Sequence, residues 1–235
     1  MAKHAEDVEA WANERQLQIS AQKSKVTLFT PETRQGRVYP LIPVGGDVLP
    51  LERYPKILGV TFDPHFHFHK HVEEIEEKAK QRLTILKALT GTTWGQQKET
   101  IIATNKSLIE SLFSFAAPIW YPNASRTSIQ KLQTIQNSAL RLATGCLMMT
   151  SIDHLHMEAE LMTVREHLDM LCSQYLATSL QREHPSYQVV TADPGPRSKK
   201  QTIQQRFNFE VALYRAPDGT ISVRHLPERI YILQR

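Results

Sequence analysis

Hydrophobic positions change their spacing about a quarter of the way along the chain. Up to residue 62, short apolar runs alternate with prolines and glycines, whereas beyond residue 70 apolar residues recur every three or four positions. The first pattern is typical of short strands and turns, and the second of amphipathic helices. The sequence therefore predicts an α+β fold that is mainly α, with a small hairpin-containing N-terminal part.

The N-terminal pattern predicts one helix followed by short extended segments. Apolar residues share one side of a helix over residues 5–16. Gly45-Gly46, set between apolar runs that prolines interrupt, predicts a turn in an edge hairpin or loop. The segment "KILGVTF", residues 56–62, predicts a compact apolar strand.

The helical pattern divides into four segments with recognisable ends. The first starts near residue 70 and ends at Gly91, and the second covers about 96–115 and is apolar on two sides, which predicts a central position. Capping boxes that start at Thr127 and Thr163 open the third and fourth. The expected buried stripe of the first segment is Val72, Ile75, Ala79, Leu83, Leu86 and Leu89.

The tail after residue 183 is expected to be mostly irregular. It begins with a basic linker, "TADPGPRSKK", and contains one hairpin signal, "ALYRAPDGTISV", with Asp218-Gly219 at the turn. A domain division at 1–62, 63–183 and 184–235 follows from these changes of pattern.

Charge is segregated along a chain whose formal net charge is +4. Residues 90–150 carry five Lys/Arg against two Asp/Glu, and 151–183 carry two against six. Such segregation permits a face that binds polyanions, and it is also compatible with ordinary solvated surfaces. No apolar run approaches the ~20 residues of a membrane span, and no secretory signal is apparent, so an intracellular location, nucleus or cytoplasm, is expected.

No self-sufficient catalytic constellation is visible. There is no P-loop and no serine nucleophile elbow, and the seven aspartates never occur as a pair. One stretch raises the question of a metal: "HFHFHKH" places four histidines at alternate positions, 65 to 71. On an extended strand they would all face one way, and two such imidazoles can share a zinc ion.

Several phrases of the sequence resemble reverse transcriptases of non-LTR retrotransposons (LINE-like, jockey-type), in the segment just beyond the catalytic aspartates. They are "WANERQLQISAQKSKVTLFTP", "KILGVTFDPHFHFHKHVEEI", "LTGTTWGQQKETIIATNKSLIESLFSFAAPIWYP", "LQTIQNSALRLATGC" and "HLHMEAELMTVREHLDMLCSQYL". They occur in the family's order over roughly residues 5 to 204. The resemblance implies the end of a polymerase palm followed by a helical thumb.

The resemblance also implies roles for particular residues. Lys23 matches a palm lysine near the phosphates of the incoming nucleotide, where a cation would stabilise the leaving group. Leu58, Gly59 and Val60 match the hairpin that grips the primer end. The thumb would hold an RNA–DNA or DNA template–primer duplex through phosphate contacts. The candidate residues for these contacts are Lys87, Trp94, Lys98, Lys106, Lys131 and Arg141.

The family pattern favours a structural interpretation of the histidines. It has a glycine-containing strand, an aspartate and a turn that ends in a histidine at a helix start, here Gly59, Asp63 and His71. We therefore expect a chance cluster in a turn, with no metal site.

The chain departs from the family in lacking the aspartate pair, fingers and most of the palm, which suggests a C-terminal remnant or a truncated reading frame. Mg²⁺ would belong to the catalytic palm, so no cofactor is expected in this chain and no polymerase activity from it alone. The expected partners are a template–primer duplex and the rest of a retroelement polymerase, with no membrane. The alternatives are a non-enzymatic nucleic-acid-binding or interaction protein derived from a retroelement, and a product without function.

Overall fold

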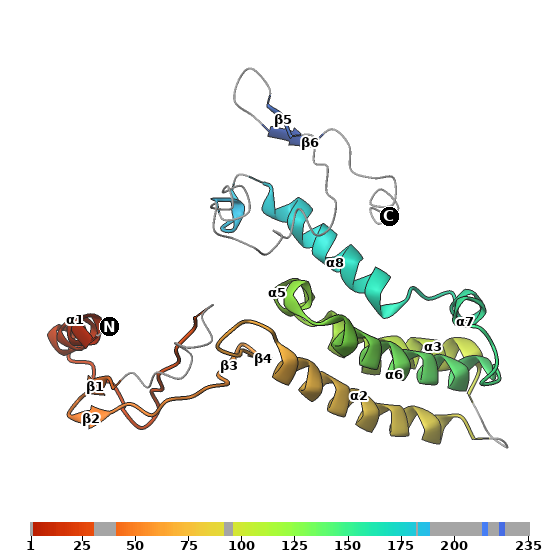
Figure 1. Cartoon of the computed structure of the whole chain (residues 1–235), viewed down its shortest axis with the longest axis horizontal. Coiled ribbons are helices and arrows are strands. Elements are labelled where there is room, and N and C mark those ends of the chain that lie inside the picture. Colours follow the sequence, from red (N-terminus) through yellow and green to blue (C-terminus); the bar gives the residue numbers. More distant parts are fainter. Residues whose placement is uncertain are drawn as a thin grey trace.

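The computed structural model describes residues 2–30, 41–91, 96–181, 183–188, 213–215 and 221–223. Helices dominate these residues, and the strands form three two-stranded hairpins, which confirms the predicted α+β, mainly α class. Figure 1 shows α1 (Ala2–Glu14) and the first hairpin at one end of the molecule and the long helices at the other. In the described part of the chain, no helix is both long and apolar enough to cross a membrane.

The N-terminal part contains α1 and two antiparallel hairpins. In the first, Pro43–Val44 (β1) pairs with Asp47–Val48 (β2), which confirms the turn predicted at Gly45-Gly46. The second consists of Lys56–Ile57 (β3) and Val60–Thr61 (β4). A third hairpin, Leu213–Arg215 (β5) with Ile221–Val223 (β6), confirms the pairing predicted in the tail, and its Asp218-Gly219 turn lies outside the described residues.

The helical part follows directly after β4. Its elements are α2 (His69–Leu89), α3 (Lys98–Asn105), the π turn η2 (Lys106–Glu110), α4 (Ser111–Ser114), α5 (Ala117–Trp120), the 3-10 turn η3 (Tyr121–Asn123), α6 (Arg126–Thr144), α7 (Ile152–Ala159) and α8 (Val164–Ser179). α2 and α6 lie side by side, and they run in the same direction, as the colours of Figure 1 show.

The stripe predicted for the first helix is the side of α2 that faces the core. Ala79 and Leu86 are fully buried, Val72, Ile75 and Leu83 are nearly so, and Leu89 packs against them. At about 25 cal/mol per Å² of apolar surface, each fully buried leucine stabilises the fold by about 2 kcal/mol. Packing of this face, more than helix propensity, therefore holds α2 in place.

The second predicted helix is interrupted by a π turn. α3, η2 and α4 follow one another without a break, and η2 widens the helix over Lys106–Glu110. The Arg82 guanidinium of α2 donates to the backbone carbonyl of Leu108 inside this turn. A carbonyl displaced from the regular ladder thus obtains a charged donor from the neighbouring helix.

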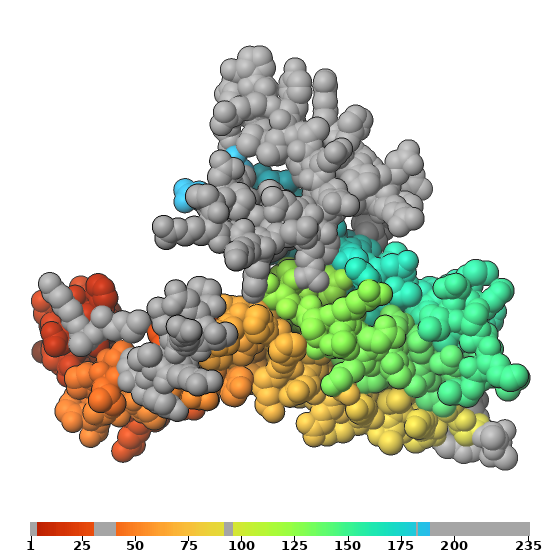
Figure 2. Space-filling view, viewed as in Figure 1, coloured from red at the N-terminus to blue at the C-terminus, as the bar shows by residue number. Residues whose placement is uncertain are grey.

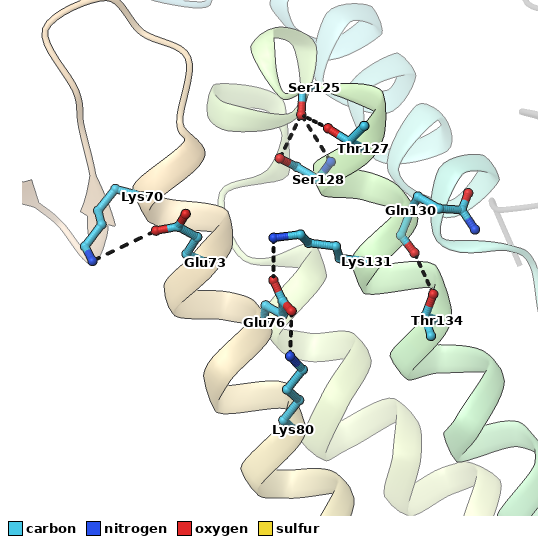
Figure 3. A network of polar contacts seen from close by, with 10 residues as sticks. All are labelled: Lys70, Glu73, Glu76, Lys80, Ser125, Thr127, Ser128, Gln130, Lys131 and Thr134. Atoms are coloured by element: carbon cyan, nitrogen blue, oxygen red, sulfur yellow. Dashed lines mark hydrogen bonds and ion pairs between the residues drawn. The ribbon is translucent and has the colours of Figure 1, made fainter.

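The helix starts agree with prediction at one position and differ at another. Thr163 and Glu166 form the predicted capping box of α8. The box predicted at Thr127 is wrong, because α6 begins two residues earlier, with Ser125 as its cap. The Ser125 hydroxyl accepts from the amide of Ser128 at 3.1 Å, as Figure 3 shows. Several Ser/Thr residues stand here in succession, and sequence alone does not choose among them.

Candidate nucleic-acid interface

The β3–β4 hairpin has a two-residue turn at Leu58-Gly59. Ile57 pairs with Val60 across the turn, and φ is +48° at Leu58 and +88° at Gly59. The single strand predicted over residues 56–62 is therefore wrong, because the chain reverses direction in its middle. Leu58 is 92% exposed and Val60 is buried, so the candidate primer-grip residues form a protruding tip and its anchor.

Polar contacts attach this hairpin to the start of α2. The amide of Thr61 donates to His71 Nδ1 at 3.3 Å, and the Thr61 hydroxyl donates to the Glu74 carboxylate at 3.0 Å. Lys56 Nζ lies 3.5 Å from Glu74 Oε2. Both hairpin strands are thus bound to one turn of α2, so the tip holds a fixed position relative to the helices.

Aromatic rings near Gly59 also support the hairpin. A Cβ atom on Gly59 would lie 3.1 Å from Phe115 Cε1, which is closer than an ordinary van der Waals contact. The indole Nε1 of buried Trp120 donates to the Phe115 carbonyl at 3.0 Å, and the Trp120 ring packs edge-on against the His71 ring. Glycine at position 59 therefore permits both the turn and the close approach of Phe115.

The histidine run forms a turn. One Asp63 carboxylate oxygen accepts from the amides of His65 and His67, and the other accepts from the amide of Phe68. His65 Nδ1 lies 2.8 Å from the Thr30 carbonyl oxygen, and no group of three or more metal-ligating side chains occurs in the parts of the chain the structure describes. This arrangement agrees with a turn cluster.

His71 is the buried member of the run. Burial lowers its pKa, with Lys56 and Lys78 acting in the same direction and Glu74 opposing them. The neutral ring accepts a hydrogen bond from the Thr61 amide through Nδ1, so the ring's own proton is on Nε2. His71 thus joins the hairpin to the helix, as expected of a structural residue at the helix entry.

Cations gather where α2 and α6 lie side by side. Glu76 of α2 contacts Lys80 one turn further on, at 2.6 Å, and Lys131 of α6, at 3.4 Å, as Figure 3 shows. The hydrogen bond from Lys80 is the main cause that lowers the pKa of Glu76; Lys131 contributes, and burial opposes both. One carboxylate therefore serves two ammonium groups, which leaves a net positive charge at this seam.

The solvent-facing side of α6 continues this positive surface. Lys131, Thr134, Ser138 and Arg141 recur at helical spacing on it, and Lys131 and Thr134 are exposed while Ser138 and Arg141 are half-buried. No Asp or Glu occurs in the sequence from 111 to 152. We call the surface made by Lys80 and Lys87 of α2 and by Lys131 and Arg141 of α6 the α2–α6 face. Lys80 is the member that sequence reasoning missed.

Two other candidate lysines lie on the helix formed by α3 and η2, which is partly covered by α6 in Figure 1. Lys98 Nζ contacts Glu158 Oε1 of α7 at 2.5 Å, and this contact raises the pKa of Lys98 and lowers that of Glu158. Lys106 is exposed at the start of η2. Glu158 belongs to the acidic segment 151–183, so this segment does not face away from all of the candidate cations.

Curated proteins similar to this chain are known from the fruit fly. The probable RNA-directed DNA polymerase from transposon BS of Drosophila melanogaster is 27% identical over an alignment of 181 residues, which covers 74% of this chain and 19% of the relative. The one from transposon X-element is 25% identical over an alignment of 185 residues, which covers 74% of this chain and 20% of the relative. The chain is similar to a region of retrotransposon reverse transcriptases.

This similarity confirms the resemblance noted in the sequence. The chain spans about a fifth of the length of the curated relatives that it matches. No family model matches the chain, and no solved structure matches it.

The last two candidate residues are Lys23 and Trp94. Lys23 is exposed in the turn after α1, where its amide donates to the Ser20 carbonyl at 3.2 Å. Trp94 lies outside the described residues. Of the predicted cations, the structure brings Lys131 to the α2 seam; Lys87 lies in the last turn of α2 and Arg141 in that of α6.

Proposed function

We propose that the α2–α6 face holds the sugar–phosphate backbone of a template–primer duplex, RNA–DNA or DNA, as part of a retrotransposon reverse transcriptase. The observation that carries this proposal is the seam at which Glu76 meets both Lys80 and Lys131, beside a helix without acidic residues. Phosphates require cations and repel carboxylates, and α6 carries Lys131 and Arg141 without any Asp or Glu.

The length of the face supports several phosphate contacts. Ten residues of helix separate Lys131 from Arg141, which is about 15 Å at the α-helical rise of 1.5 Å. This corresponds to about four phosphate steps of one strand at 3.4 Å each. The hydroxyls of Thr134 and Ser138 lie between the two cations and donate to backbone carbonyls of α6, so Lys131 and Arg141 are the groups of this helix that would contact phosphates. The face therefore positions a duplex without reading its sequence.

The hairpin tip supports a second contact in the same proposal. Leu58 projects from a turn that is anchored to α2 and supported by Phe115. We assign this tip to the primer end, where a rigid apolar contact would restrict the last nucleotide. Catalysis would come from an aspartate pair outside this chain, so the isolated chain is expected to bind a duplex and not to extend a primer.

A pair of matched double variants tests the face. Lys87→Ala/Lys131→Ala removes two lysines of the α2–α6 face, and Lys98→Ala/Lys106→Ala removes two from the α3–η2 helix. Each pair contains one lysine with a carboxylate partner, Lys131 with Glu76 or Lys98 with Glu158, so each variant loses two positive charges and one ion pair.

Binding of an RNA–DNA hybrid should be measured over a salt series. The first variant should lower the slope of log affinity against log salt by about two and weaken binding about 10- to 100-fold, alike for different sequences, because each phosphate contact releases counterions. The control variant should change both quantities much less. Equal effects of the two variants would mean that the α2–α6 face has no special role.

A further inference from the structure

The loop between α6 and α7 is unusually apolar for an exposed segment. Leu147, Met148 and Met149 are consecutive and are 74%, 82% and 88% exposed. Exposed apolar residues that occur singly are normal, but three in succession are a feature of interaction sites. The sequence also has no charged residue from 142 to 152.

Two capped helix ends hold this loop. α6 ends at Gly145, whose φ is +70° and whose amide donates to the Arg141 carbonyl at 2.9 Å. The amide of Thr150 donates to the Leu147 carbonyl at 3.0 Å, which closes a turn with Met148 and Met149 at its centre. Ser151 then caps α7. The two methionines thus stand at the centre of a defined turn.

The loop follows the last turn of α6, the helix that supplies two cations of the α2–α6 face. Arg141, the last cation of α6, lies one helical turn before Gly145, and the loop follows directly. A protein partner would tolerate carboxylates beside an apolar loop, whereas a phosphate backbone repels them. Residues 111–152 contain no carboxylate, and the first one after the loop is Asp153 of α7, so the loop itself is free of them, which favours nucleic acid as the occupant.

We propose that Leu147, Met148 and Met149 form an apolar wedge that enters the minor groove of the bound duplex and partly unstacks a base step. This inference rests on the proposed function of the α2–α6 face. Leucine and methionine are side chains that minor-groove proteins insert between bases, and the resulting bend lets the duplex follow more of the protein surface. Methionine is unbranched and polarisable, which suits a contact with base faces.

The test uses the full chain with the triple variant Leu147→Ser/Met148→Ser/Met149→Ser. The probes are RNA–DNA hybrids that carry the fluorescent base 2-aminopurine at successive positions, because its emission rises when it is unstacked. Leu41→Ser is the matched control, since Leu41 is 76% exposed and lies in the N-terminal part. All three replaced side chains are exposed, so circular dichroism should show unchanged helix content.

The wild-type chain should raise the emission at one position of the hybrid. The triple variant should lose this rise and bind about tenfold more weakly, which corresponds to 1.4 kcal/mol, with an unchanged salt slope because no phosphate contact is removed. The control should behave like the wild type. Duplex binding without a rise in emission would overturn the wedge and leave the α2–α6 face intact.

Two other outcomes would also overturn the wedge. If neither protein binds the hybrid, the function of the face fails together with the wedge. If the wild type self-associates in sedimentation and the triple variant is monomeric, with the same emission from the hybrid, the loop is a contact between protein chains.

Discussion

The two hairpins that precede the helical part have the same turn in different surroundings. Gly45 and Gly46 have φ of +60° and +87°, and Leu58 and Gly59 have +48° and +88°. Each turn connects two strands of two residues. Side-chain atoms added at Gly45 or Gly46 would meet nothing within 4 Å, whereas those at Gly59 would meet Phe115. The amide of Gly45 donates to Glu9 Oε1 of α1 at 3.0 Å, so a neighbouring helix holds each hairpin, and the two turns differ in the space around them.

The difference at the first turn position is the more instructive. The β1–β2 hairpin has glycine there, which adopts positive φ at little cost, and the β3–β4 hairpin has Leu58. A non-glycine residue held in this region is strained by about 1–2 kcal/mol. The side chain also buries almost nothing, at 92% exposure. Strain without burial at an anchored tip is the pattern expected of a contact residue.

The largest effect on stability should come from a substitution at Gly59, the second residue of the β3–β4 turn. Gly59→Ala should destabilise the chain by about 2–3 kcal/mol, because positive φ and the contact with Phe115 both oppose a Cβ atom. Gly46→Ala, at nearly the same φ but in open space, should cost about 1 kcal/mol. Urea unfolding of both variants measures the difference. Equal losses of stability in the two variants would show that the Phe115 side chain moves aside at little energetic cost.

The next effect concerns the attachment of the β3–β4 hairpin to α2. Thr61→Val removes the hydroxyl that donates to Glu74 and leaves that carboxylate with one fewer donor. We expect a loss of about 1–2 kcal/mol in the free energy of unfolding, as for other hydrogen bonds to charged groups. Thr84→Val is the control, because Thr84 is an exposed residue of α2. Similar losses for both would exclude a specific anchor at Thr61.

Sequence reasoning predicted the parts of this fold that depend on local periodicity. The buried stripe of α2 and the Gly45-Gly46 turn follow from spacing and glycine chemistry. The residue pattern alone missed the β3–β4 hairpin, which only the family resemblance implied, because a leucine at positive φ contradicts local preference and the apolar run is typical of a strand. Only the contacts with α2 and Phe115 make that conformation stable.

The candidate site was predictable in its charge and not in its arrangement. The excess of basic residues over 90–150 is visible in the sequence. The partners of those residues come from distant segments, as Lys131 with Glu76 and Lys98 with Glu158 show. Such pairs depend on which helices are neighbours, so a count of charges does not separate an available cation from a neutralised one.

Lower pH should destabilise the chain through His71, which joins the β3–β4 hairpin to α2. The pKa of His71 is lowered in the folded chain, so below about pH 6.5 the unfolded chain binds more protons, and stability falls as pH decreases. His71→Asn keeps an acceptor for the Thr61 amide but cannot titrate. Urea unfolding at pH 7.5 and 5.5 should therefore show a greater loss for the wild type. His167, whose pKa burial also lowers, is present in both proteins and cancels in the comparison.

The smallest effect on stability should be a gain. Leu58→Asn should stabilise the chain by about 0.5–1 kcal/mol, because asparagine tolerates positive φ and leucine gains little from burial here. Under the proposed function it should also weaken binding to a duplex with a recessed 3′ end, and leave binding to a blunt duplex unchanged. Gly45→Asn, at the matching position of the β1–β2 hairpin, should alter neither the affinity for the recessed duplex nor that for the blunt one. A stabilised variant with unchanged preference for the recessed end would remove the tip from the primer contact, and the strain at Leu58 would then have no function in binding.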